Sequence, residues 1–262
     1  MRTHAKIFQL ALLALFISCN KKETTLEQYI NTEIASGEVP GIGISITVKG
    51  DILLSEGYGY ADIENQIPYT DSTIINIASI SKTFIGVSMM HAVEKGLLNL
   101  DEDVNKYLSF KIVNPHRPDK KILVKHLMAH RSSIIDEKKV YYTESYNYGG
   151  DAPTNLGDFL KNYLSEGGSN YSKKNFLDKA PGSKHEYSNI GAGLAAHILE
   201  SVMKKPFNLI TRDLIFKPLG MKNTVWFLSE MKNQSNHAKL YKKDKDKNKL
   251  SEVELYGLIT YP

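Results

Sequence analysis

Cysteine is almost absent from this sequence: Cys19 is the only one in 262 residues, which excludes an intrachain disulfide framework. An excess of one charge is also absent, because 33 lysines and arginines face 29 acidic residues. No basic stripe interleaves with aromatic residues, so nucleic-acid binding is not expected. The composition, 42% hydrophobic and 24% charged, is that of a globular protein with one large domain or two intimate subdomains.

Long apolar runs are also scarce, and the clearest one lies at the N-terminus. Basic residues precede the run Ile7–Ile17, which is too short to span a bilayer as a helix and is typical of a secretory signal. Cys19 follows it behind a small residue, which resembles a bacterial lipobox. We therefore expect a signal peptide over residues 1–18, and a lipidated Cys19 with a polar tether over residues 19–25. The protein would be an exported periplasmic or cell-surface lipoprotein; the alternative is a plain signal peptide with an incidental cysteine.

The next part of the chain predicts a helix and a β-hairpin. Apolar residues recur at helical spacing over residues 26–36. Apolar and small residues then alternate over residues 42–48, and a Lys-Gly-Asp turn leads to a return strand over residues 52–60. Gly57 and Gly59 in the return strand indicate a bulge or close packing.

The rest of the chain is organised around Ser79 and Lys82. They are three residues apart, which places them on the same face of a helix. The residues before them are β-branched and those after them are apolar up to Gly96. Ser79 is therefore expected at a helix N-terminus, where free N–H groups and the helix dipole favour a developing negative charge. Ser79 is the candidate acyl-accepting nucleophile and Lys82 the base that activates it. The alternative is a helix cap followed by a solvated lysine. We expect the buried side of this helix to carry Phe84, Val87, Met90 and His91.

A second polar motif lies before a helix rich in glycine and alanine over residues 190–203. Tyr187 as a general base and Asn189 as an amide that binds a substrate carbonyl would complement the serine and the lysine. The alternative is that the tyrosine packs and the asparagine caps the helix.

Three other features have simpler interpretations. His126 and His130 have the spacing of two metal ligands, but no third ligand is evident, so we expect them to hold a helix end and a loop by hydrogen bonds. Residues 136–180 are polar and rich in tyrosine and glycine, which indicates a long surface insertion with one helical patch at 156–164. The charge run 239–249 is expected to be a solvated loop; a lysine replaces the glycine that a calcium loop needs. No metal or other cofactor is expected.

Several stretches, taken in order, resemble one known family. They are Ser79–Lys82, 100–104, 125–130, Pro181-Gly182, Tyr187–Asn189 and Pro218–Met221. Together they resemble the serine β-lactamase-like family, in particular class C β-lactamases, DD-peptidases and related esterases. The similarity extends from about Gly41 to the C-terminus.

The resemblance implies an α/β (α+β) fold of the β-lactamase/transpeptidase type. A sheet flanked by helices would carry the hairpin, a mostly helical subdomain would span about residues 97–220, and the site would lie in the cleft between them. It also implies that Ser79 is the nucleophile and that Lys82 and Tyr187 share the acid–base work. Asn189 would bind the substrate amide, and the Ser79 backbone N–H would form half of an oxyanion hole.

The sequence departs from the family pattern at two places. His130–Ser133 stands where the family has His-Thr-Ser-Gly, and glycine there permits a positive φ, so Ser133 is expected to strain or reshape that loop. The family's third motif, Lys/His-x-Gly, has no match between Met221 and Pro262. We therefore expect a domain over residues 26–262 that lacks its C-terminal strands and has an incomplete sheet with a bare edge.

Two functions follow from these observations. The first is an exported serine acyl hydrolase that acts through an acyl-enzyme on an amide, a β-lactam or an ester. The second is a catalytically impaired surface lipoprotein that binds cell-wall fragments or a protein partner on the same scaffold; the missing third motif favours it. In either case we expect a monomer, a small-molecule or peptide ligand, and membrane attachment through a lipid on Cys19.

Overall fold

The computed structural model describes residues 25–244 and 249–261. The predicted signal peptide over residues 1–18 and the predicted lipidation site at Cys19 lie outside these residues. In the part that the structure describes, no helix has the length and apolar character needed to cross a membrane. The chain divides into two compact units. Unit 1 extends to Asp71 and includes Tyr241–Ser251, and unit 2 contains Ser72–Leu240 and the segment from Glu252 onward.

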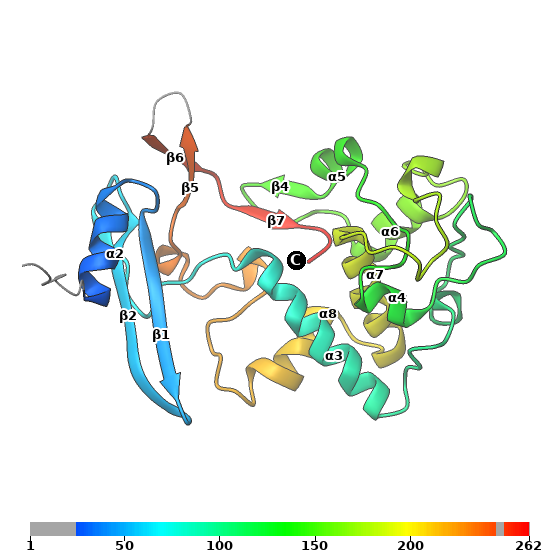
Figure 1. The fold of residues 1–262 in the computed structure, drawn as a ribbon, viewed down its shortest axis with the longest axis horizontal. Helices are drawn as coiled ribbons and strands as arrows, with labels where there is room; N and C mark the ends of the chain where they lie inside the picture. The colour runs from blue at the N-terminus through cyan, green and yellow to red at the C-terminus, as the bar shows by residue number, and fades with distance from the viewer. Residues whose placement is uncertain (1–24, 245–248, 262) are drawn as a thin grey trace, which may run out of the picture. The chain divides into compact units, whose positions relative to one another are not determined.

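Unit 1 is built on an antiparallel sheet in the order β1-β2-β3 (Figure 1). Its elements are α2 (Leu26–Ala35), β1 (Gly41–Val48), β2 (Asp51–Asp62), β3 (Ile67–Pro68) and most of the paired strands β5 (Leu240–Asp244) and β6 (Lys249–Val253). Helix α2 begins with a capping box, in which Thr25 Oγ1 accepts from the Gln28 N–H and Gln28 Oε1 accepts from the Thr25 N–H, each at 3.2 Å. The predicted helix and hairpin are thus both present.

Glycines shape the β1–β2 hairpin. The connecting turn places Lys49 and Gly50 at φ 52° and 94°, the left-handed conformation that two-residue hairpin turns favour. Gly57 and Gly59 leave no room for a side chain, because a Cβ would lie 2.5 Å from the Tyr69 carbonyl oxygen at Gly57 and 2.5 Å from the Pro40 oxygen at Gly59. The close packing predicted for these two glycines is confirmed.

The charge run 239–249 was expected to be a solvated loop, and this prediction is wrong for most of its described residues. Residues 240–244 form β5, which pairs with β6. Tyr241 Oη accepts from the Ile63 N–H and donates to Glu64, which ties β5 to the end of β2. Long lysine side chains can cover a strand pair while their ammonium groups stay in water, so a charge run alone does not exclude a strand.

Unit 2 is mostly helical. Its α-helices are α3 (Lys82–Glu94), α4 (Val124–Met128), α5 (Lys138–Glu144), α6 (Leu156–Leu164), α7 (Asn189–Met203) and α8 (Phe207–Thr211). Its short 3₁₀ turns are Ala78–Ser81, Val104–Tyr107, Lys173–Asn175, Leu228–Glu230 and Gln234–Asn236, and a π-helical turn spans Arg212–Phe216. Strands β4 (Tyr146–Tyr148) and β7 (Tyr256–Leu258) pair antiparallel and lie side by side in Figure 1.

Helix α7 lies at the centre of the core of unit 2 and packs against α3, α4, α6 and α8. Its small residues allow close approach: a Cβ on Gly193 would lie 3.3 Å from the side chains of Leu156 and Thr260. Fully buried side chains from the surrounding helices pack on Ile198 and its neighbours in α7 and complete this core, among them Met89, Leu160, Tyr163 and Phe207. The start of α7 is therefore held by a rigid scaffold.

The buried face of α3 is rotated by about one residue from the predicted one, although Phe84 and His91 are partly buried and Phe84 packs against Phe216. Ile85, Ser88, Met89 and Ala92 are buried, whereas Val87 and Met90 are about half exposed. Apolar residues occur on every side of this helix, so their spacing does not identify the face that meets α7 and α8.

Residues 136–180 are not a simple surface insertion, which corrects another prediction. The expected helix is present as α6, but Tyr141, Phe159, Tyr163 and Phe176 are buried in the core, and β4 pairs with β7 near the other end of the chain. Tyrosine-rich segments look polar in a sequence, yet a tyrosine ring can be buried when its hydroxyl finds a partner.

Candidate active site

The four predicted site residues all belong to unit 2 and lie at the beginnings of two helices. Ser79 and Lys82 are in the 3₁₀ turn Ala78–Ser81 and the first turn of α3. Tyr187 and Asn189 flank Ser188, the N-cap of α7. Helix beginnings leave backbone N–H groups without helical acceptors, which suits a site where negative charge develops.

The backbone before Ser79 has an uncommon conformation. Ala78 has φ 45°, in the left-handed region that a residue with a Cβ adopts at a cost of about 1–2 kcal/mol. Ala78 is the first residue of the 3₁₀ turn, and Ile77 before it has φ −94° and ψ 7°. The Ser79 side chain is on the surface of the unit, where a substrate can reach it.

Hydrogen bonds join the four predicted residues into one cluster. Ser79 Oγ lies 2.7 Å from Tyr187 Oη, and Lys82 Nζ donates to Ser79 Oγ at 3.2 Å. Lys82 Nζ also donates to Asn189 Oδ1 at 2.8 Å and lies 5.1 Å from the centre of the Tyr187 ring. The structure therefore brings together the hydroxyl of Ser79, the amine of Lys82 and the phenol of Tyr187, although Ser79 and Tyr187 are 108 residues apart in the sequence.

The carboxylate of Asp136 binds the beginning of α7, and the sequence did not indicate this role. Asp136 Oδ2 accepts from the backbone N–H and the side-chain Nδ2 of Asn189, at 2.8 and 2.9 Å. Asp136 Oδ1 accepts from Ser188 Oγ at 2.7 Å and from the Ile190 N–H at 3.1 Å. The only sequence signal is that Asp136 follows closely after the family-like segment His130–Ser133.

The backbone around Asp136 is held by a buried tyrosine of α6. Tyr163 Oη donates to the Ile135 carbonyl oxygen at 2.8 Å and accepts from the Glu137 N–H at 2.7 Å. The Tyr163 side chain is fully buried, and burial raises the pKa of its phenol, so it stays protonated. The residues on both sides of Asp136 are therefore fixed to the core.

His130 packs against Tyr187. Their ring centres lie 4.5 Å apart, and His130 Nδ1 accepts from the Ser188 N–H at 3.3 Å. Burial lowers the pKa of His130, and the charges of Lys82 and His185 lower it further, so the imidazole stays neutral. His126 Nδ1 accepts from the Leu123 N–H at 3.1 Å. Both histidines hold local structure by hydrogen bonds, as predicted. Among the residues that the structure describes, no group of three or more His, Cys, Asp or Glu side chains is arranged to hold a metal.

Ser133 has the left-handed conformation expected where the family has glycine. Its φ is 68°, and its buried hydroxyl donates to the Lys179 carbonyl oxygen at 2.9 Å. The loop therefore holds Ser133 in a conformation that glycine adopts freely, and the Ser133 hydroxyl adds a hydrogen bond that glycine could not make.

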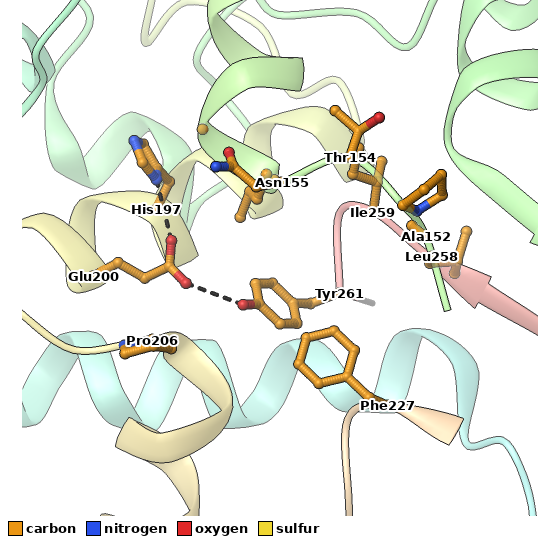
Figure 2. Close-up of a pocket in the computed structure, with 13 residues that line it drawn as sticks. Ala152, Thr154, Asn155, His197, Glu200, Pro206, Phe227, Leu258, Ile259 and Tyr261 are labelled. Atoms are coloured by element: carbon orange, nitrogen blue, oxygen red, sulfur yellow. Dashed lines mark hydrogen bonds and ion pairs between the residues drawn. The ribbon is translucent and has the colours of Figure 1, made fainter. Parts of the chain in front are cut away.

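A cavity of about 510 Å³ lies elsewhere in unit 2 and is lined by none of the four predicted residues (Figure 2). Its polar wall is Glu200, whose carboxylate accepts from His197 Nδ1 at 3.1 Å, from Tyr261 Oη at 3.0 Å and from the Phe207 N–H at 3.0 Å. Figure 2 shows the first two of these bonds as dashed lines. These contacts tie the segment after β7 to α7 and α8, which accounts for the partly buried carboxylate without a ligand.

The fold and the cluster together define a class. A helical unit that presents a Ser-x-x-Lys motif at one helix beginning and a tyrosine before another is the arrangement of the β-lactamase-like serine hydrolases. The chain belongs to the Beta-lactamase family, which it matches over residues 26–256. The predicted family and fold class are confirmed.

Known proteins are similar to this chain over most of its length. Protein flp of Staphylococcus aureus (strain N315) is 28% identical over 222 residues, which cover 83% of this chain and 41% of that protein. The structure of an octameric penicillin-binding protein homologue from Pyrococcus abyssi is 27% identical, with a TM-score of 0.68, and the match covers 90% of this chain and 53% of the homologue. The structure of D-amino acid amidase from Ochrobactrum anthropi SV3 is 26% identical, with a TM-score of 0.64, over 81% of this chain and 55% of the amidase. The chain spans about two fifths of the length of the first curated relatives that it matches.

Proposed function

We propose that this protein is a serine acyl hydrolase that forms an acyl-enzyme on Ser79 from an amide, a β-lactam or an ester. One observation carries the proposal: Ser79 Oγ lies within hydrogen-bond distance of two groups that can exchange its proton, Tyr187 Oη at 2.7 Å and Lys82 Nζ at 3.2 Å. Membership of the Beta-lactamase family and the likeness to an amidase and to a penicillin-binding protein homologue support it.

In the acylation step, Ser79 Oγ attacks the carbonyl carbon and its proton passes to the Tyr187–Lys82 pair. The backbone N–H of Ser79 stabilises the oxyanion that forms. The carbonyl carbon then expels the leaving nitrogen or oxygen, which takes a proton from the same pair. In the deacylation step a water gives its proton to the pair and attacks the ester, and Ser79 Oγ is protonated again as it leaves.

Asn189 keeps its predicted role as a substrate-binding residue in this proposal. Its Oδ1 accepts from Lys82, and one Nδ2 hydrogen donates to Asp136. A side-chain amide carries two such hydrogens, and the second one has no acceptor within the described part of the chain. That hydrogen is available to a substrate carbonyl.

The test is covalent labelling of the purified protein with a fluorescent penicillin and with a fluorophosphonate, followed by intact-mass measurement. We expect a mass increase equal to one acyl or phosphonyl group. Ser79→Ala should abolish it, and Ser81→Ala, a change in the same turn, should not. Absence of an adduct on the wild-type protein with either probe, or labelling that survives Ser79→Ala, would remove the proposal.

A second candidate function is reversible binding of cell-wall fragments or a protein partner without catalysis. The observation that favours it is the likeness, at 27% identity, to the penicillin-binding protein homologue from Pyrococcus abyssi, a protein described by what it binds. Fragment binding in calorimetry that is unchanged by Ser79→Ala, together with an unchanged mass after incubation with the probes, would support this function over the first.

We also propose that the protein is exported as a monomeric lipoprotein whose anchor is Cys19. The support is the apolar run before this cysteine, as described from the sequence. Metabolic labelling with an alkyne fatty acid should tag the wild-type protein and not Cys19→Ser. A labelled Cys19→Ser variant would contradict the assignment.

A further inference from the structure

We propose that Asp136 is a positioning residue for acyl transfer: it holds Asn189 in the one orientation that presents an acceptor to Lys82. The proposal rests on the serine hydrolase function above and adds a residue to it. Three hydrogen bonds in series connect Asp136 to the nucleophile. Asn189 donates to Asp136, and Lys82 donates both to Asn189 and to Ser79.

The chemistry of the two ends fixes the amide between them. An ionised carboxylate can only accept hydrogen bonds, and Lys82 Nζ carries hydrogens that it can donate in both of its protonation states. The Asn189 amide lies between the two, with Nδ2 at 2.9 Å from Asp136 Oδ2 and Oδ1 at 2.8 Å from Lys82 Nζ. The flipped amide would place its oxygen against the carboxylate, which is repulsive whatever the charge of the lysine, and its hydrogens against those of Lys82 Nζ. Asp136 therefore selects the orientation in which Asn189 accepts from Lys82.

This orientation determines where the Lys82 amine lies. A lysine side chain has a long flexible stem, and ordering it costs conformational entropy. Of the two hydrogen bonds that Lys82 Nζ donates, the one to Asn189 Oδ1 is shorter, at 2.8 Å, than the one to Ser79 Oγ, at 3.2 Å. Without that acceptor, Nζ is no longer held beside the Ser79 hydroxyl with which it exchanges a proton. Small displacements of a reacting group lower reaction rates strongly.

Asp136 is itself held from two directions, as a positioning residue must be. Ser188 Oγ and the Ile190 N–H bind Oδ1, which prevents rotation of the carboxylate. Tyr163 bonds to the backbone of Ile135 and Glu137 on either side. A buried tyrosine of α6 is thereby connected to the reacting serine through an unbroken series of contacts.

The test compares the variants Asp136→Asn and Asn155→Ala. Asp136→Asn keeps the size of the side chain and one acceptor oxygen, which can stay with the Ser188 hydroxyl and the Ile190 N–H. Its amide nitrogen then replaces Oδ2 and cannot accept from Asn189, so the Asn189 amide can take either orientation. We expect its acylation rate constant at saturating probe to fall about 10- to 100-fold. Asn155→Ala removes the side chain that caps α6 and that bonds to neither Asp136 nor Asn189. It should lower the melting temperature and leave the acylation rate unchanged.

A rescue variant separates positioning from a general structural role. Asp136→Asn with Asn189→Asp puts the carboxylate at position 189, where it again offers an acceptor to Lys82 and accepts from the amide at 136. The carboxylate at position 189 cannot donate to a substrate carbonyl, so the half-saturating probe concentration should stay raised, while the acylation rate constant at saturating probe should recover most of the loss. Wild-type acylation by Asp136→Asn, an equal loss in Asn155→Ala, or no recovery of the saturated rate constant in the double variant would overturn the proposal.

A readout without catalysis distinguishes this proposal from the function on which it rests. The side-chain amide signals of Asn189, identified in ¹⁵N NMR spectra by their loss in Asn189→Asp, should shift in Asp136→Asn and not in Asn155→Ala. A wild-type protein that forms no adduct while these signals shift would overturn the hydrolase function and keep the positioning contact. Signals that do not shift in Asp136→Asn would overturn the positioning role whatever the activity.

Discussion

Replacing Ser133 by alanine and by glycine separates two opposing contributions to the stability of unit 2. Ser133 has φ 68°, and its buried hydroxyl donates to the Lys179 carbonyl oxygen at 2.9 Å. The left-handed conformation costs a residue with a Cβ about 1–2 kcal/mol, and a neutral hydrogen bond contributes about 1 kcal/mol. The Lys179 carbonyl oxygen also accepts from Asn114 Nδ2 at 3.2 Å, so it still has a partner when the Ser133 hydroxyl is removed.

Ser133→Ala loses the hydrogen bond and keeps the strain, so its free energy of unfolding should fall by about 1 kcal/mol. Ser133→Gly also loses the bond, and the more flexible unfolded chain lowers the free energy of unfolding by a further amount of about 0.4–1 kcal/mol. It releases the strain, however, which is worth about 1–2 kcal/mol. The glycine variant should therefore lie within about 1 kcal/mol of wild type and be more stable than the alanine variant.

The measurement is urea unfolding followed by tryptophan fluorescence. Trp226 is the only tryptophan of the chain, and it packs against Phe207 and Tyr261 in unit 2, so its emission reports on this unit. The three proteins should have equal slopes and different midpoints. An alanine variant as stable as the glycine variant, or more stable, would show that the backbone at Ser133 carries no strain and would refute the reasoning.

Three further predictions concern the cluster and its supports. Tyr187→Phe removes the hydroxyl 2.7 Å from Ser79 Oγ and keeps the ring packed against His130. Acylation by the probe should slow by about 10²–10⁴ while the urea midpoint stays unchanged. Slowing together with a lower midpoint would indicate a structural role instead. The pKa of His130 is lowered mainly by burial, so the unfolded chain takes up the proton first, and the free energy of unfolding should fall as pH drops below about 6.5. Urea midpoints against pH should show this fall, and His130→Asn should reduce it; an equal fall in the variant would contradict the assignment. Tyr163→Phe leaves two backbone groups beside Asp136 without their partner, so the free energy of unfolding should fall by about 1–3 kcal/mol and acylation should slow with it, as measured by urea unfolding and probe labelling.

Local chemistry explains the parts of the structure that the sequence predicts well. Ser79 and Lys82 are neighbours on a helix because of their spacing alone. The β1–β2 hairpin follows from period-two alternation and a Lys-Gly turn whose two residues adopt the left-handed conformation. The helix α7 follows from Ser188, whose hydroxyl caps it by accepting from the Gly191 N–H at 2.9 Å. In each case the determining residues are within a few positions of one another.

Contacts between distant segments explain what the sequence does not predict. Asp136 reaches the beginning of α7 across more than 50 residues, and an isolated aspartate in a polar segment carries no sign of that partner. The buried face of α3 is selected by α7 and α8, since apolar residues such as Val87 and Met90 lie on its exposed side. The pairing of β4 with β7 joins residues about 110 positions apart, with too few residues in either strand for a recognisable pattern.

The uncommon backbone conformations in unit 2 concentrate beside the candidate site. Among the residues of unit 2 that the structure describes, five other than glycine have a positive φ, and three of them are Ala78, His130 and Ser133. Each costs about 1–2 kcal/mol, so each persists only where the surrounding structure fixes it. Ala78 precedes the candidate nucleophile, His130 supports the Tyr187 ring, and Ser133 lies in the loop that leads to Asp136. The buried helix α7 and the Tyr163 contacts supply the fixed surroundings. A backbone shaped at this cost around one hydroxyl is more consistent with a site that orients a reacting serine than with a helix cap, because a cap forms with ordinary backbone angles and needs no such support.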